Sequence, residues 1–387
     1  MSELFEKLRL DDSDKFPFGV GESVEVRTAN CDELYFAATV KSIECHETSS
    51  GENIRTATVI YDADGETESG ILATSMKCNE QLRLYDDGEA LVVTLGHIHI
   101  EGEGIRRARL LSFKSSPHLY QSAILLDQHS DKDDALDFTF IPFEVEQALA
   151  LTIPIVASIS AAFASRSMRC CVVGVGAGCL ISSLDRCSGI PLEIVGIEVS
   201  DQMLKVARDF FGYRCADTRC KDGITAFDDT KEEEMFDVIV IDVAAPDAAA
   251  AHSELELPPE SFVSFDFLRK ANARLLPGGV IAVNVLATRG KLTELVERLV
   301  RMFTVYVLAV DPNYVLYLFP EHQKKRQHAI SPSCVHQAAA KYPAMMHMCG
   351  PVLEEVKHTG YYASKNILLG WFDASLFLEL LPKAQLV

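Results

Sequence analysis

The sequence has few basic residues for its length. Its 36 Lys and Arg residues are outnumbered by 56 Asp and Glu residues, and the formal net charge is −20. A nucleic-acid interface needs clustered Lys and Arg to replace the counterions of the phosphate backbone, so we expect no nucleic-acid partner. An acidic surface suits a basic protein partner, because complementary charge speeds encounter; the alternative is a role in solubility alone.

The cysteine spacing typical of metal sites is also missing. The 11 cysteines include no pair of CxxC motifs, and the adjacent Cys170 and Cys171 lie in an apolar segment. We therefore expect buried reduced thiols, no structural zinc and no metal at the site. The N-terminus, MSELFEKLRLDDSDKF, has neither the apolar core nor the cleavage site of a signal peptide, which favours a cytoplasmic location.

Uncharged runs of nearly membrane-spanning length are scarce. Residues 148–164 form one stretch of 17 residues without a charge, which is close to the length that spans a membrane. The stretch contains Pro154 and small polar residues, and a glycine-rich segment follows it. It predicts a helix buried against a sheet, and we expect no membrane association.

The first quarter of the chain has the pattern of short β-strands. Polar and apolar residues alternate over residues 22–27, 35–43, 55–61 and 69–73, and Asp64-Gly65 offers a tight hairpin turn. This predicts a small all-β barrel. We expect an N-terminal tail at 1–16, the barrel at 17–85, a linker or strand extension at 86–105, and a second domain at 106–387.

The second domain alternates apolar strands with helical segments. Helical patterns over residues 201–211, 259–276 and 291–303 separate strands that are almost continuously hydrophobic: CCVVGV, LEIVGIEV, FDVIVIDV, GGVIAVNV and TVYVLAV. Strands that are buried on both faces of a parallel sheet have this pattern. The fold class is therefore α/β, with a doubly wound sheet.

The end of this sheet distinguishes two candidate folds. TVYVLAV (304–310) is followed by DPNY and then by VLYLFP (315–320), which leaves no room for a crossover helix. Parallel strands need a dozen or more residues to reconnect, so these two strands are expected to form an antiparallel hairpin. A dinucleotide-binding sheet would continue with another βα unit. A final antiparallel strand instead resembles the seven-stranded sheet of class I methyltransferases, which we expect here.

A glycine-rich loop follows the first strand of the sheet. Gly174, Gly176 and Gly178 lie between this strand and a helix start, where the backbone can approach a ligand; a plain tight turn is the alternative. The next strand ends at Glu198, which is 198 − 178 = 20 residues after the last glycine. An acid at this strand end can accept hydrogen bonds from both hydroxyls of a ribose.

Two further acids follow later strands. Asp222, beside Gly223, could accept the adenine amino group, and the fourth strand delivers Asp242. Ligands of open α/β sheets bind at the carboxyl ends of the strands, although each Asp could instead cap a helix. Together these residues predict a nucleotide-type ligand at one edge of the sheet.

The longer motifs resemble a known family. LLPGGVIAVNV (275–285) and SFKSSPHLYQSAILL (112–126) are similar to spermidine synthase-like class I methyltransferases. FDVIVIDV, the segment LPPESFVSFDFLRKANARLLPGGV and the chain end GWFDASLFLELLPKAQLV resemble the C-terminal catalytic half of the methyltransferase-like protein 13 family. That family methylates elongation factor 1-alpha on a lysine and on its N-terminal amine, and its C-terminal half is assigned to the N-terminal amine.

The resemblance implies roles for individual residues and names S-adenosylmethionine as the cofactor. The glycine loop would hold its methionine part, Glu198 its ribose, and Asp222 with Gly223 its adenine. Asp242 would lie near the methionine amino group, and Gln121 matches a cofactor-facing segment. The implied partner is a protein substrate with a reactive amine, such as elongation factor 1-alpha.

The sequence departs from the family after the fourth strand. The family usually has the sequence D-V-D-S-K-D there, but this chain has Val-Ala-Ala-Pro-Asp after Asp242. Ala244 therefore replaces the second carboxylate, and Asp247 remains with Asp242 as a candidate catalytic residue. Polyamine synthases usually have D-S-S-D, and Ala245 replaces the second Asp of that motif. The expected function is methyl transfer from S-adenosylmethionine to a protein amine. The alternatives to it are a spermidine synthase-like aminopropyltransferase and a catalytically silent methyltransferase fold that serves as a Tudor-containing binding protein.

The N-terminal region resembles a Tudor or SH3-like module. GESVEVRTANCDELYFAATVKSI and TATVIYDADGETESGIL carry the similarity. Readers of methylated Lys or Arg use an aromatic cage that attracts the cation. Phe36 and Tyr61 match cage positions, and the alternative is that both rings pack in the core of the barrel.

Overall fold

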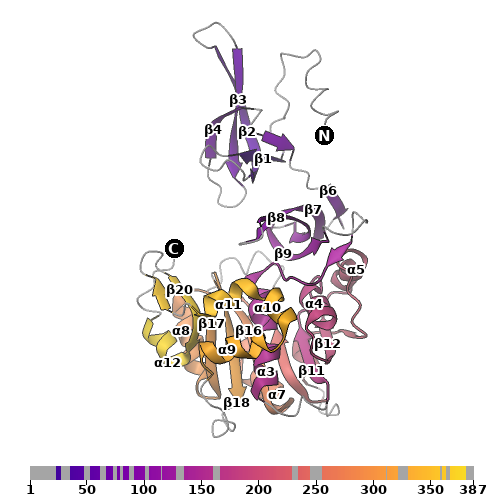
Figure 1. Ribbon diagram of the computed structural model, residues 1–387, viewed down its shortest axis with the longest axis vertical. Coiled ribbons are helices and arrows are strands. Elements are labelled where there is room, and N and C mark those ends of the chain that lie inside the picture. Colours follow the sequence, from indigo (N-terminus) through magenta and orange to yellow (C-terminus); the bar gives the residue numbers. More distant parts are fainter. Residues whose placement is uncertain are drawn as a thin grey trace. The chain divides into compact units, whose positions relative to one another are not determined.

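The computed structural model divides the chain into two compact units. These units are Met1–Leu82 and Arg83–Val387, shown together in Figure 1. The structure describes residues 23–27, 35–47, 53–61, 67–72, 76–78, 82–86, 91–100, 104–114, 116–127, 135–159, 166–228, 234–244, 255–310, 312–320, 330–357, 360–362 and 367–380.

The first unit is a five-stranded antiparallel sheet. Its strands have the order β4-β3-β2-β1-β5, and β1 pairs with both β2 and β5. This arrangement confirms the small all-β module that the alternating pattern predicted. The strands are β1 (Ser23–Arg27), β2 (Tyr35–Glu47), β3 (Asn53–Tyr61), β4 (Thr67–Leu72) and β5 (Met76–Cys78).

The second unit begins with another antiparallel sheet, of order β10-β9-β8-β7-β6. Strand β7 and the start of β8 lie in the range for which we expected a linker or strand extension. Apolar side chains of this sheet, including Leu91 and Leu111, pack against Met203 in helix α5 (Asp201–Phe210) and against Phe211, which follows that helix. Its strands are β6 (Leu82–Asp86), β7 (Leu91–Ile100), β8 (Gly104–Phe113), β9 (Ser116–Leu126) and β10 (Leu136–Asp137).

The large sheet has the order β13-β12-β11-β14-β16-β18-β17-β20-β19. Strands β13, β12, β11, β14 and β16 are parallel, whereas β18 pairs antiparallel with β16 and with β17. Numbered in chain order, the seven central strands have the order 3-2-1-4-5-7-6 with the seventh reversed. This confirms the doubly wound class I methyltransferase fold and the expected hairpin.

The residue ranges of the central strands nearly coincide with the apolar runs that were predicted as strands. Strand β15 pairs with the end of β16, and β20 with β19 extends the edge beyond β17, so the sheet is larger than the seven strands expected. The strands are β11 (Met168–Val173), β12 (Leu192–Glu198), β13 (Asp217–Cys220), β14 (Phe236–Ile241), β15 (Leu255–Leu257), β16 (Leu275–Ala287), β17 (Phe303–Val310), β18 (Asn313–Pro320), β19 (Gly360–Tyr362) and β20 (Ile367–Asp373).

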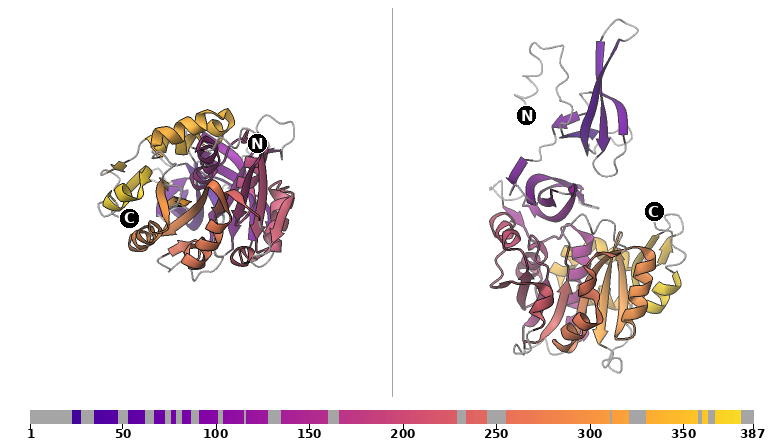
Figure 2. Two further views of the ribbon diagram at one scale, coloured as in Figure 1. Left: turned by 90° about the horizontal axis from the view of Figure 1, so that it is seen from below. Right: turned by 180° about the vertical axis from the view of Figure 1, so that it is seen from behind.

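Helices cover both faces of the large sheet, as Figure 2 shows in the view from below, where α9 to α11 and α7 to α8 lie on opposite sides. The helices are α2 (Glu144–Ala150), α3 (Thr152–Ile159), α4 (Cys179–Cys187), α5 (Asp201–Phe210), α6 (Gly223–Ala226), η4 (Glu260–Val263), α7 (Phe265–Ala273), α8 (Arg289–Leu299), α9 (Pro332–Ala340), α10 (Pro343–Met348), α11 (Gly350–Lys357) and α12 (Ala374–Leu380). The three predicted helical segments contain α5, η4 with α7, and most of α8.

Alternation along each central strand produces two hydrophobic cores. In β11, Cys170 and Val172 face the core under α2, α3 and α9 to α11. The intervening Cys171 and Val173 face the core under α7, α8 and α12. A strand with both faces buried needs apolar residues at successive positions, which explains the continuous runs in the sequence.

The uncharged stretch at 148–164 begins in a buried helical segment. It contains the end of α2 and all of α3, and every residue from Ala148 to Val156 is buried. The hydroxyl of Tyr317 in β18 donates to the carbonyl of Ala148 at 2.6 Å, which ties α2 to the sheet. Among the described helices, none is both long and apolar enough to cross a membrane.

Candidate functional site

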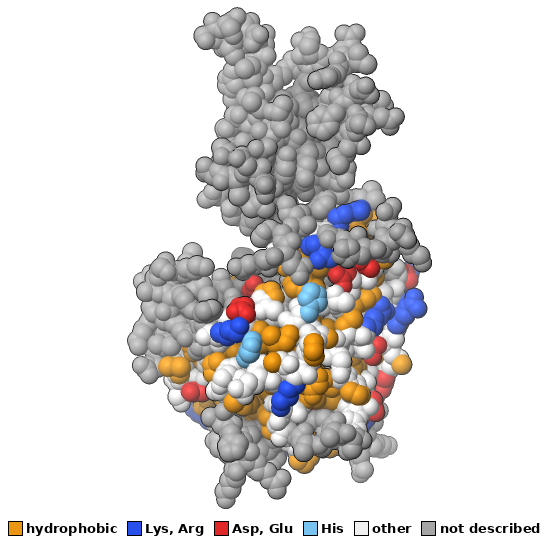
Figure 3. Space-filling model, viewed as in Figure 1, with side chains coloured by type: hydrophobic (Ala, Val, Ile, Leu, Met, Phe, Trp, Pro, Cys, Tyr) orange, Lys and Arg blue, Asp and Glu red, His pale blue; other side chains and the backbone are white. Residues whose placement is uncertain are grey.

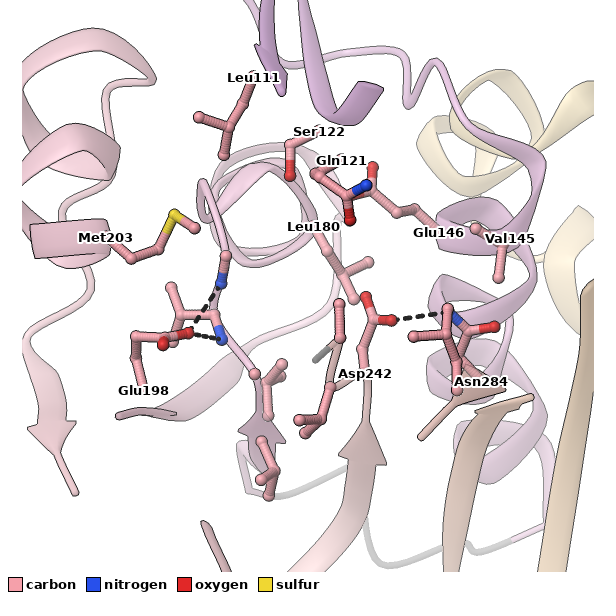
Figure 4. Close-up of a pocket in the computed structure, with 18 of the residues that line it drawn as sticks. Leu111, Gln121, Ser122, Val145, Glu146, Leu180, Glu198, Met203, Asp242 and Asn284 are labelled. Atoms are coloured by element: carbon pink, nitrogen blue, oxygen red, sulfur yellow. Dashed lines mark hydrogen bonds between the residues drawn. The ribbon is translucent and has the colours of Figure 1, made fainter. Parts of the chain in front are cut away.

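A cavity of about 840 Å³ lies at the carboxyl ends of the parallel strands. Such volumes are typical of sites for small organic ligands. Strands β11, β12 and β16 contribute residues near their carboxyl ends, and the segment that follows β14 contributes Asp242. Strands β8 and β9 and the start of α2 form the opposite wall. Figure 4 shows Glu198 and Met203 on one side of the glycine loop, and Asp242, Asn284 and Glu146 on the other.

The glycine loop joins β11 to α4, and all three of its glycines have positive φ angles. A Cβ atom on Gly174 would lie 1.9 Å from the carbonyl oxygen of Asp242, and one on Gly178 would lie 2.3 Å from the ring of Tyr213. These two glycines are therefore required by packing. At Gly176 the nearest atom would be 3.6 Å away, so this position leaves space next to the cavity.

Glu198, at the end of β12, holds this loop in place. Its Oε2 accepts hydrogen bonds from the backbone N–H groups of Val175 at 3.1 Å and Gly176 at 3.2 Å. Its Oε1 accepts from the N–H of Ser200 at 3.0 Å. A carboxylate has about four lone-pair sites that can accept hydrogen bonds. Three N–H donors occupy three sites of Glu198, so about one site remains for a ligand hydroxyl.

Asp222 caps a helix and also lines the cavity. It is the N-cap of α6, where its Oδ1 accepts from the N–H groups of Ile224 at 2.7 Å and Thr225 at 3.1 Å. The capping role that we considered as the alternative is therefore present. The side chain is exposed, and both Asp222 and Gly223 line the cavity, so capping is compatible with contact to a ligand.

Asp242 ends a chain of amide hydrogen bonds. The Nδ2 group of Asn284 donates to Oδ1 of Asp242 at 2.9 Å, and Nδ2 of Asn313 donates to Oδ1 of Asn284 at 2.8 Å. Burial raises the pKa of the Asp242 carboxyl above its usual range, and the hydrogen bond from Asn284 opposes that rise. The two amides fix the orientation of the carboxyl at the edge of the cavity.

Glu146 is a second carboxyl at this end of the cavity. It belongs to α2, it is 7% exposed, and its Oε2 is buried without a hydrogen-bond partner among the described residues. Burial raises the pKa of Glu146 well above its usual range, and the negative charge of Asp242 adds to the effect. The sequence analysis did not single out Glu146, because no strand end or motif marks it.

Most of the predicted site residues lie together. The structure brings seven of them to the same cavity: Gln121, Gly174, Gly176, Glu198, Asp222, Gly223 and Asp242. Gly178 lies behind the loop, where it is the N-cap of α4. Asp247 lies outside the described residues. Within the described part of the chain, no group of three or more His, Cys, Asp or Glu could hold a metal ion.

The candidate reader residues lie in the first unit. Phe36 is in β2 and Tyr61 is the last residue of β3. Their side chains lie outside the described residues, so a reader site at Phe36 and Tyr61 stays a prediction.

Comparisons with known proteins give distant structural similarities. No family model matches the chain, and no curated protein matches it. Human methyltransferase-like protein 13 in complex with SAH is 22% identical, with 52% of this chain and 92% of that chain covered and a TM-score of 0.46. A probable spermidine synthase from Corynebacterium glutamicum is 17% identical, with 76% and 92% covered and a TM-score of 0.47.

A third similar structure is also a spermidine synthase. The spermidine synthase from Thermotoga maritima is 12% identical, with 76% of this chain and 84% of that chain covered and a TM-score of 0.40. All three identities are below 25% and all three TM-scores are below 0.5, so these similarities are distant.

Proposed function

We propose that this chain is an S-adenosylmethionine-dependent methyltransferase that acts on a protein amine, either an N-terminal amine or a lysine. The position of Glu198 carries the proposal. Its carboxylate holds the glycine loop at the edge of a large cavity, on a sheet whose last strand is antiparallel. A ribose-binding acid beside a glycine-rich loop is the arrangement that a nucleoside-containing cofactor requires.

The residues of the cavity fit this cofactor. The remaining lone pair of Glu198 can accept a ribose hydroxyl, and the open space at Gly176 lets the backbone approach the ligand. Asp222, Gly223 and Gln121 line the same cavity. In this proposal Asp222 and Gly223 contact the adenine, and Gln121 donates from the opposite wall. Asp242 would receive the ammonium group of the methionine part.

The cofactor, when bound, supplies a methyl group on a positively charged sulfur. The chain has to hold this group in line with the acceptor nitrogen and to exclude water. Val145 and Leu180 provide apolar walls on the Asp242 side of the cavity. Asp242 is oriented by Asn284 and offers negative charge to a positively charged donor or acceptor.

The charge of the chain supports a basic protein as the substrate. The net charge of −20 favours encounter with a positively charged surface. The face in Figure 3, which α9 and α10 help to form, carries scattered charges of both signs among hydrophobic side chains, so the support comes from the net charge alone. Elongation factor 1-alpha is the acceptor that the sequence resemblance names, and we propose it as the first protein to test.

The experiment is a methyl-transfer assay with labelled S-adenosylmethionine and recombinant elongation factor 1-alpha, with the modified site mapped by mass spectrometry. We expect methylation of an amine by the wild-type chain and little by Glu198→Ala. Cofactor binding without transfer to any protein of a cell lysate would contradict the enzymatic proposal. Methylation of another lysate protein would replace elongation factor 1-alpha as the acceptor.

A further inference from the structure

Glu146 and its neighbour Gln147 on α2 differ in their hydrogen bonds. Gln147 donates from Nε2 to the carbonyl of Ile141 at 2.7 Å and accepts from the N–H of Val352 at 3.2 Å. These bonds tie α2 to the segment that precedes it and to α11. Oε2 of Glu146 has no partner among the described residues, although the side chain is 7% exposed. A buried polar group without a partner is costly and calls for an explanation.

The surroundings of Glu146 favour a cation. Five carboxylates line the cavity, namely Glu144, Glu146, Glu198, Asp222 and Asp242, and no Lys, Arg or His is among its described lining residues. Glu146 and Asp242 lie on the same side of the glycine loop, and they approach from α2 and from β14 respectively. A ligand with a positively charged group would therefore compensate the charge of the Glu146 carboxylate, which lines this cavity.

We propose that Glu146 binds the ammonium group of the acceptor amine and accepts its proton before methyl transfer. This inference rests on the proposed function and names the side chain that prepares the acceptor. Asp242 lies at the strand edge beside the glycine loop, where we place the ammonium group of the cofactor. Glu146 reaches the cavity from α2 and not from the sheet, and we assign the two carboxyls to two different ammonium groups.

The proton and electron balance is simple. The acceptor enters as R–NH₃⁺ and transfers one proton to the carboxylate of Glu146, which leaves R–NH₂ and a neutral carboxylic acid. The nitrogen lone pair then forms the new N–C bond, and the electrons of the broken C–S bond return to the sulfur, which becomes a neutral thioether. The product is R–NH₂–CH₃⁺, and Glu146 releases its proton after the product leaves.

The environment of Glu146 suits a proton acceptor. Burial and the charge of Asp242 raise its pKa, which brings the carboxyl closer to the pKa of an amine and makes proton transfer less unfavourable. Besides Asp242, Cys179 of α4 is electrostatically coupled to Glu146. In the ligand-free chain, the folded state binds the proton of Glu146 more tightly than the unfolded state does. The free energy of unfolding should therefore fall as pH rises from the ordinary pKa range of Glu to the raised pKa.

The test compares the wild-type chain with Glu146→Gln, which keeps the size of the side chain and removes its charge. Glu294→Gln is the matched control, because Glu294 is 61% exposed on α8 and pairs only loosely, at 3.5 Å, with Lys291. Each protein is saturated with S-adenosylhomocysteine and heated with glycinamide, a small primary ammonium compound, or with N-acetylglycinamide, which lacks the ammonium group. S-adenosylhomocysteine affinity is measured separately by calorimetry.

We expect glycinamide to raise the unfolding temperature of the wild type and of Glu294→Gln, but not of Glu146→Gln. The three affinities for S-adenosylhomocysteine should agree within about twofold. In the ligand-free state, the stability of Glu146→Gln should fall less with rising pH than that of the wild type, because only Asp242 keeps a raised pKa there. Equal stabilisation of Glu146→Gln by glycinamide would overturn the inference. A loss of about tenfold or more in S-adenosylhomocysteine affinity would overturn it too, because Glu146 would then serve the cofactor.

The proposed function can fail separately. If the wild type does not bind S-adenosylhomocysteine at all, both the function and the role of Glu146 are refuted. If it binds the cofactor and methylates a protein amine while Glu146→Gln behaves as the wild type, only the role of Glu146 is refuted.

Discussion

Replacement of Glu198 by Ala tests the cofactor site most closely among single substitutions. The carboxylate of Glu198 accepts three backbone N–H groups and has about one lone-pair site left for a ribose hydroxyl. One hydrogen bond to a charged group contributes about 1.5–3 kcal/mol. We therefore expect Glu198→Ala to weaken binding of S-adenosylhomocysteine by about 10- to 150-fold.

The substitution should leave the fold intact. Glu198 is partly exposed at a strand end, so water can reach the N–H groups that lose their acceptor. The control is Glu193→Ala on the same strand, because the Glu193 side chain is 63% exposed and lies outside the cavity. Calorimetry gives the affinities, and thermal unfolding confirms that all three proteins are folded. A folded Glu198→Ala protein with wild-type affinity would refute the assignment of Glu198 to the ribose.

Three further substitutions test other parts of the structure. Gly176→Ala and the control Gly189→Ala both replace a glycine with positive φ, so each should lose about 1–2 kcal/mol of stability in urea unfolding. Only Gly176→Ala should also weaken cofactor binding, measured by calorimetry. Equal affinities of the two variants would show that Gly176 does not approach the ligand. Arg166→Met removes both 2.7 Å bonds to the buried Asp237 and should cost about 1–3 kcal/mol in urea unfolding; unchanged stability would mean that the pair contributes nothing. Ala244→Asp restores a carboxylate at the cavity edge and should raise turnover on an amine without a change in cofactor affinity; equal or lower turnover would contradict this role.

The fold could be predicted because its strands are buried on both faces. Continuous apolar runs such as FDVIVIDV mark the central strands, and the short DPNY connection requires the antiparallel hairpin of β17 and β18. Strand β20 was not predicted. It pairs with β17, from which α9, α10 and α11 separate it in the chain, and such distant pairing leaves no local pattern.

The acids of the site could be predicted for a related reason. Parallel strands place their carboxyl ends at one edge of a sheet, so Glu198 and Asp242 had to lie near the same cavity. Glu146 could not be found in this way, because α2 precedes the parallel strands and its packing depends on β18 and α11. Asn284 was visible as a polar residue inside an apolar strand, but only the structure shows that it donates to Asp242.

The central claim is that the cavity at the carboxyl edge of the sheet binds S-adenosylmethionine. The most direct measurement is a calorimetric titration of the wild-type chain with S-adenosylhomocysteine and, in parallel, with NAD. The account predicts saturable one-to-one binding of S-adenosylhomocysteine and no measurable heat from NAD, because the loop and Glu198 belong to a methyltransferase sheet. Equal affinity for NAD, or no binding of S-adenosylhomocysteine, would contradict it.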